Sequence, residues 1–137
     1  MPSYREDNKK HCYKFYNANP KKKLTVGDCV IRAITKASGE EYIKVYDSLC
    51  EIGRGLCCPP NWKDAFEEYL KNNGFVKMKQ PKKPNGKKYT VTELAKEIKK
   101  GRIVVSIARH LTCIVDGTIY DTWDCSQKCV GNYWIKK

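Results

Sequence analysis

The chain has 137 residues, of which 41% are hydrophobic, and this size and content suit one domain with one core. Lysine and arginine number 27 against 15 acidic residues, so the net charge is +12 at pH 7. No early secretion signal is present and no apolar run approaches membrane-spanning length. These features exclude a membrane-spanning protein and lead us to expect a cytoplasmic one.

The positive charge is gathered in short lysine blocks at 21–23, 82–83, 87–88 and 136–137. Such blocks suit contact with phosphates or with an acidic protein partner. These blocks are spread along the chain, however, and neither a nucleic-acid-binding motif nor an interleaved set of aromatic residues accompanies them. The pattern favours solvated loops, so a nucleic acid is not the favoured partner.

Eight cysteines in a short chain are typical of a disulfide framework only in an oxidising compartment. Without a signal for export, we expect free thiols, a metal site or one catalytic thiol. A zinc site would have to use the short-spaced groups, which are His11-Cys12, Cys57-Cys58 and Cys125 with Cys129. Structural zinc sites usually repeat a two- to four-residue gap twice. Only one such pair exists here, so we predict no metal and no cofactor, with zinc as the alternative.

Residues 1–12 are polar and lack periodicity, which predicts a flexible N-terminal arm before a domain at 13–137. The strongest helical pattern begins at Gly27-Asp28-Cys29, where apolar residues recur at spacings of three and four until Gly39. Asp28 suits the N-cap of this helix. We therefore place Cys29 in the first helical turn.

Three further helices are expected from apolar stripes and breakers. One spans about 43–53, and one follows Pro60, with Asn61 as its cap, and ends at Gly74. A short helix begins at Thr90, whose spacing to Glu93 fits a capping box, and ends at Gly101. Lysine, proline and glycine at 77–88 predict an exposed connection between the last two helices.

The C-terminal third has the β-branched pattern of strands at 103–107 and 111–115, a partner strand that starts at Thr118, and 133–135 as a closing strand. Asp116-Gly117 between two of these strands is a strong signal for a two-residue hairpin turn. Helices followed by strands predict an α+β fold, in which N-terminal helices pack on a C-terminal antiparallel β-sheet.

A candidate thiol site lies at the start of the first helix. Unpaired amides and the positive end of the helix dipole favour a thiolate at Cys29. His110 begins the second predicted strand and would act as its base. The alternative is that Cys29 is a small buried hydrophobic residue and His110 an ordinary surface histidine.

The hairpin turn predicts which acid accompanies His110. A two-residue turn pairs Val115 with Thr118 and carries His110 opposite Trp123. His110, Asp121 and Trp123 then share one face, with Asp121 diagonally across from the imidazole. Asp121 is therefore the predicted orienting acid, and Asp124 is the alternative triad acid if the register slips by one residue. Trp123 either shields the pair from water or packs in the core.

Three segments carry a resemblance to a known family. They are Asn19-Pro20, the run from Gly27 to Ile34, and the run from His110 to Asp124. Together they resemble small uncharacterised papain-like cysteine peptidase-fold proteins of bacteriophages and Gram-positive, often gut, bacteria. The order of cysteine on an early helix, histidine on a later strand and acid on the next strand is that of papain-like cysteine peptidases.

The resemblance implies a papain-like domain at 13–137 that acts as a peptidase, isopeptidase or amidase on a peptide or amide substrate. It implies catalytic Cys29, His110 and Asp121, working through an acyl-enzyme. The oxyanion hole would use the backbone N–H of Cys29 and the side chain of Asn19 or Asn17, because Lys23 stands where papain has a glutamine. It also implies a bacterial cell or a phage-infected host as the setting.

Two other functions fit the same residues. The chain is alternatively a non-catalytic binding or inhibitor protein, for example a phage-encoded one, whose basic surface engages an acidic partner. The same triad also serves an acyltransferase, which differs only in the acceptor. We expect an enzyme, and the reactivity of the Cys29 thiol is the property that separates catalysis from binding.

Overall fold

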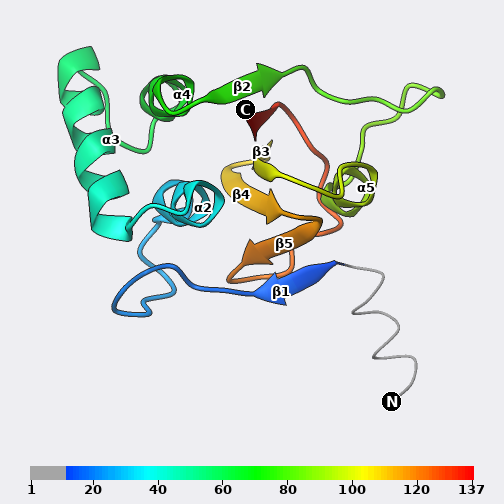
Figure 1. Cartoon of the computed structure of the whole chain (residues 1–137), viewed down its shortest axis with the longest axis horizontal. Coiled ribbons are helices and arrows are strands. Elements are labelled where there is room, and N and C mark those ends of the chain that lie inside the picture. Colours follow the sequence, from blue (N-terminus) through cyan, green and yellow to red (C-terminus); the bar gives the residue numbers. More distant parts are fainter. Residues whose placement is uncertain (1–11) are drawn as a thin grey trace.

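The structure is a computed structural model that describes residues 12–137, so the predicted flexible arm lies, apart from Cys12, outside the described residues. In chain order the elements are β1 (Tyr13–Phe15), α2 (Cys29–Ser38), α3 (Tyr42–Leu56), α4 (Lys63–Asn72), β2 (Phe75–Met78), α5 (Val91–Glu97), β3 (Arg102–Ile107), β4 (His110–Val115), β5 (Thr118–Asp121) and β6 (Tyr133–Lys136). Figure 1 shows α2, α3 and α4 on one side of the sheet and α5 on the other. The α+β class predicted from the sequence is confirmed.

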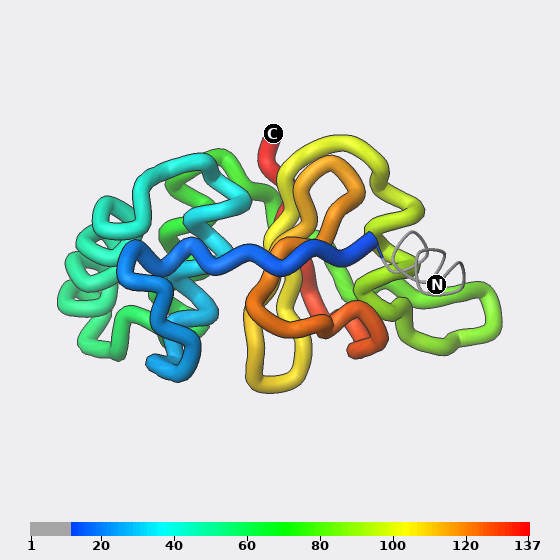
Figure 2. The backbone as a smooth tube through the Cα atoms, turned by 90° about the horizontal axis from the view of Figure 1, so that it is seen from below, coloured from blue at the N-terminus to red at the C-terminus, as the bar shows by residue number. Residues whose placement is uncertain are grey.

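The sheet has six strands in the order β1-β5-β4-β3-β6-β2. It is mixed, because β1 runs parallel to β5 while the other neighbours are antiparallel. The prediction of an antiparallel sheet is therefore wrong at the β1 edge, and the prediction of a C-terminal sheet is wrong for both edge strands. The edge strands β1 and β2 come from the N-terminal part of the chain and its middle, and their three and four residues are too short to show a periodicity. Figure 2 shows the N-terminal segment running along the β5 edge.

The central hairpin has the register expected from its turn. Val115 pairs with Thr118, Ile114 with Ile119 and Cys113 with Tyr120, as predicted. Asp116 has φ 50° and Gly117 has φ 82°. Positive φ at both central residues is what a type I′ turn requires, which is why this dipeptide was a usable signal.

The two faces of the sheet bury two separate hydrophobic clusters. Val104 and Leu111 point to one face and pack with the buried stripes of α2, α3 and α4. Ile103 and Ile114 point to the other face, where they pack with Leu94 of α5. Alternate strand residues face opposite sides of a sheet, so the continuous apolar runs of β3 and β4 supply both clusters.

The helices form where they were expected, with differences at their ends. Helix α2 begins at Cys29 and ends before Gly39, whose φ of 78° gives the left-handed cap. The capping box of α5 is present, but this helix ends at Glu97 rather than near Gly101. Helix α3 continues past Gly53 to Leu56. Helix α4 has Trp62 rather than Asn61 at its N-cap.

The buried apolar residues of these helices pack in the two hydrophobic clusters. Among the helices within residues 12–137, none combines the length and the apolar character needed to cross a bilayer.

Candidate functional site

Three residues predicted as a triad meet at one end of the sheet. Cys29 is the first residue of α2, His110 the first of β4 and Asp121 the last of β5. The Nε2 atom of His110 lies 2.7 Å from Oδ2 of Asp121. An imidazole has two ring nitrogens, so this contact leaves Nδ1 available to the Cys29 thiol, whose interaction with His110 raises the pKa of the imidazole. The triad is thus a chain of contacts from thiol to carboxylate.

Asp121, and not the alternative Asp124, is the acid that reaches His110. The side chains of His110 and Asp121 are only 10% and 5% exposed. The second oxygen of Asp121 accepts a hydrogen bond from the backbone N–H of Thr122, at 2.7 Å. Asp124 instead accepts one from the N–H of Ser126. When the predicted hairpin register is continued beyond its last pair, Cys113 and Tyr120, it places Asp121 and not Asp124 beside His110.

The contacts shift the protonation of all three groups. Burial raises the pKa of the Cys29 thiol, but hydrogen bonds from His110 and from the backbone N–H of Leu111 bring it below its ordinary value. Burial lowers the pKa of His110, and the hydrogen bonds with Asp121 and Cys29 reverse this and raise it to about 9. Burial opposes the charge of Asp121, yet the contact with His110 holds its pKa below the usual value. The shifts of the thiol and of the imidazole both favour the ion pair of thiolate and imidazolium over the neutral pair.

Trp123 covers the imidazole. Its ring centroid lies 5.0 Å from that of His110, with 55° between the ring planes. The indole is 40% exposed, so it belongs to the surface around the site and not to the core. The predicted neighbourhood of Trp123 and His110 is confirmed, and the alternative that Trp123 packs in the core is not.

A buried polar network supports the start of α2. Asp28 is 7% exposed and makes no side-chain cap, contrary to our prediction. Its carboxylate accepts hydrogen bonds from Asn19 Nδ2 at 3.0 Å and from the Tyr42 hydroxyl at 2.8 Å. Its other oxygen lies 3.2 Å from Nε of Arg32. Two hydrogen-bond donors and the Arg32 cation engage this carboxylate in place of the local amide, which explains why the side chain in the N-cap position does not cap the helix.

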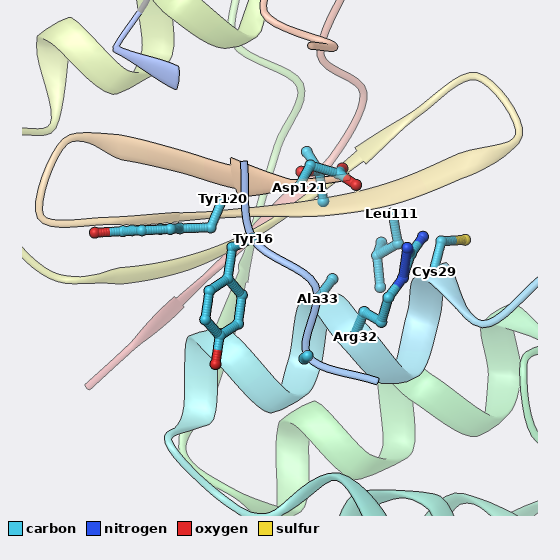
Figure 3. Close-up of a pocket in the computed structure, with 9 residues that line it drawn as sticks. Tyr16, Cys29, Arg32, Ala33, Leu111, Tyr120 and Asp121 are labelled. Atoms are coloured by element: carbon cyan, nitrogen blue, oxygen red, sulfur yellow. The ribbon is translucent and has the colours of Figure 1, made fainter. Parts of the chain in front are cut away.

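Arg32 links this network to the sheet. Its Nη1 donates to the Thr122 hydroxyl at 3.0 Å, next to Asp121. Figure 3 shows Arg32 extending from α2 beside Cys29, with Asp121 across the small pocket that they help to line. The positive charge of Arg32 also favours the thiolate form of Cys29. The segment before the helix, the helix and β5 are therefore linked beside Cys29.

The predicted oxyanion side chains lie in this buried network. Asn19 donates to Asp28, and Asn17 donates from Nδ2 to the Lys23 carbonyl at 3.0 Å. Both asparagines are 6% exposed, and neither lines the cleft that contains Cys29 and His110. Asn61 does line that cleft, and it is exposed. Sequence reasoning missed it because Asn after Pro59-Pro60 also fits a helix cap.

Of the candidate zinc ligands that lie within residues 12–137, which are Cys12, Cys57, Cys58, Cys125 and Cys129, only Cys125 belongs to a group of three or more possible ligands. His11 lies outside the described residues, and Cys125 is buried whereas Cys129 is exposed. Among residues 12–137, one group has ligand atoms within 4.8 Å of one another, namely His110, Asp121 and Cys125.

That group does not fit a zinc ion as it stands. Two ligands of one tetrahedral zinc ion lie about 3.3 Å apart, given bonds of about 2.0 to 2.1 Å. The His110 and Asp121 atoms are 2.7 Å apart. Burial raises the pKa of the Cys125 thiol to about 12, and its Sγ lies 3.7 Å from Asp121 Oδ2. The arrangement is that of hydrogen bonds onto a carboxylate.

In the comparisons with known proteins, no family model matches the chain, and neither does any curated protein or any solved structure.

Proposed function

We propose that the protein is a cysteine hydrolase of papain-like type, which cleaves a peptide, isopeptide or other amide through an acyl-enzyme. The observation that carries this proposal is the chain of contacts from Cys29 through His110 to Asp121, with opposite pKa shifts of the thiol and the imidazole. A thiolate at neutral pH is the form of cysteine that attacks carbonyl carbon.

The proposed reaction begins with attack of the Cys29 thiolate on the carbonyl carbon. A C–S bond forms as the π electrons of the carbonyl move to its oxygen. In this scheme the oxygen accepts hydrogen bonds from the backbone N–H of Cys29 and from the side-chain amide of Asn61, which lines the same cleft. His110 holds a proton at neutral pH and gives it to the leaving amine as the C–N bond breaks. Water then attacks the thioester, His110 takes its proton, and the carboxylic acid product leaves with the thiolate restored.

Asp121 orients the imidazole in this scheme. It keeps Nε2 of His110 occupied, so that Nδ1 faces the thiol, and its charge stabilises the imidazolium. The roles predicted for the three residues are retained, with one refinement. Because His110 is already protonated, it serves first as the acid and only later as the base.

The test is labelling with an electrophilic acyl probe, read by mass spectrometry of the peptide that contains Cys29. We expect rapid labelling at neutral pH that is lost in Cys29→Ala and strongly slowed in His110→Ala. Cys129→Ala removes another thiol, one that is exposed, and serves as the matched control. If Cys29 is labelled no faster than Cys129, the site is not catalytic and the protein acts by binding.

A further inference from the structure

The cleft in front of the nucleophile has two walls and a volume of about 280 Å³. The first wall is the start of α2 and the segment that leads into α4, and the second is the turn from β3 to β4. The residues that line it include Cys29, Asn61, Lys63, Ser106, Arg109 and His110. A substrate that presents its carbonyl to Cys29 must therefore pass between the two walls.

Both walls of this cleft carry a positive charge. Lys63 stands on the first wall and Arg109 on the second, and both are exposed. Of the described residues that line the cleft, none is acidic. Within residues 12–137, neither cation is held in an ion pair with an acid. Two cations that face one space without a counter-charge attract an anion into it.

The backbone positions of these two residues favour other residue types. Lys63 is the first residue of α4, where the positive end of the helix dipole disfavours a cation. Arg109 has φ 58°, a left-handed conformation that glycine or asparagine adopts at less cost. Neither positive charge stabilises the helix or turn that carries it, so local structure does not account for a cation at either place.

We propose that the cleft selects a substrate with a carboxylate close to the carbonyl that Cys29 attacks, such as an acyl group from an acidic amino acid. This rests on the proposed function, since it names the substrate of the same site. Lys63 and Arg109 hold the carboxylate from opposite walls while the C–S bond forms, and the leaving amine takes the proton of His110. The carboxylate is bound in the ground state and is unchanged by the reaction.

The test uses two alkylating agents of similar size and different charge, iodoacetate and iodoacetamide. Each forms a C–S bond with the Cys29 thiolate and releases iodide, so neither requires turnover. The ratio of the two rates at Cys29 reports the local potential. Arg109→Gly and Lys63→Gln should each lower the iodoacetate to iodoacetamide ratio by about threefold or more at low salt, and the double variant should lower it further.

Both variants are expected to fold. Lys63→Gln removes a cation from the positive end of a helix dipole, and Arg109→Gly places glycine in a left-handed backbone conformation. Arg109→Lys keeps the charge and should keep most of the ratio. Lys100→Gln is the matched control, because Lys100 is an exposed lysine that precedes β3, whereas Arg109 follows its far end. Added salt should reduce the wild-type ratio and leave that of the double variant nearly constant.

The outcomes separate the two proposals. If Cys29 reacts faster than the other thiols but the ratio is equal in wild type, Arg109→Gly and Lys63→Gln, the charge selection is refuted and the thiol site stands. If Cys29 shows no enhanced reactivity with either agent, the proposed function fails first. A matched pair of glutamyl and glutaminyl acyl probes should show the same preference for the anionic member, and equal labelling by both would also refute the selection.

Discussion

Replacing Asp121 by asparagine removes one charge from the site and keeps the shape of the side chain. In the wild type, a carboxylate oxygen lies 2.7 Å from His110 Nε2 in a place where both side chains are nearly buried. An amide there can still hold the ring, but it does not stabilise the imidazolium. The change therefore separates the orienting effect of Asp121 from its electrostatic effect.

The pKa of His110 gives the size of the expected effect. A rise from 6.5 to about 9 corresponds to roughly 3 kcal/mol. Both Asp121 and Cys29 contribute to that rise, so about half of it, or about 1.5 kcal/mol, is assigned to Asp121. Removing the charge should lower the pKa of His110 by about one unit. It should raise the pKa of Cys29 in turn, because a less protonated imidazole stabilises the thiolate less.

The assay is the rate of alkylation of Cys29 by iodoacetamide between pH 4 and pH 10. In the wild type we expect the rate to remain high well below the pH at which a free thiol loses its reactivity, since the pKa of Cys29 is lowered. In Asp121→Asn the acid limb of this profile should move to higher pH, with a loss of about tenfold in rate near pH 6.

Asp124→Asn is the matched control, because it removes the same charge three residues further on. Its profile should follow that of the wild type, since the carboxylate of Asp124 accepts its hydrogen bond from Ser126. Identical profiles for wild type and Asp121→Asn would contradict the reasoning. A shift in Asp124→Asn alone would show that the other acid is the partner of His110 in solution.

Two further variants test the support of the site and of the fold. Asp28→Asn removes the charge that faces Arg32 at 3.2 Å, so this buried cation loses its counter-charge. We expect a loss of about 3 kcal/mol in the free energy of unfolding, measured with urea, and an unchanged midpoint would contradict the structural role of the network. Thr90→Ala removes the capping box of α5 and should cost about 1 kcal/mol. Because α5 packs on the opposite face of the sheet from α2, the alkylation rate of Cys29 should not change, and a slower rate would show that the two faces are coupled.

The comparison of Asp121 with Asp124 shows how far local sequence rules reach. The dipeptide Asp116-Gly117 has few conformations open to it, so it determined the turn and, through the alternation of side chains, the face shared by His110 and Asp121. The start of α2 was equally local, because apolar spacing and Gly39 mark both of its ends. These signals were sufficient to place Cys29 in the first turn of α2 and to choose Asp121 as the partner of His110.

The tertiary structure decided what depends on segments distant in the chain. Asp28 is a good cap by local rules, but Asn19, Tyr42 and Arg32 converge on it once the chain is folded. The short edge strands β1 and β2 form by pairing with β5 and β6, and three or four residues are too few for a periodicity that would predict them.

The walls of the cleft also depend on contacts between distant segments. Asn61 and Lys63 precede or begin one helix, Arg109 sits in a turn, and only packing of α4 beside the β3–β4 turn brings them in front of Cys29. By itself, the sequence determined the order of thiol, imidazole and carboxylate along the chain and the register between the last two. The folded arrangement decided the surroundings of the thiol, because contacts between distant segments depend on packing and leave no pattern in any single stretch of residues.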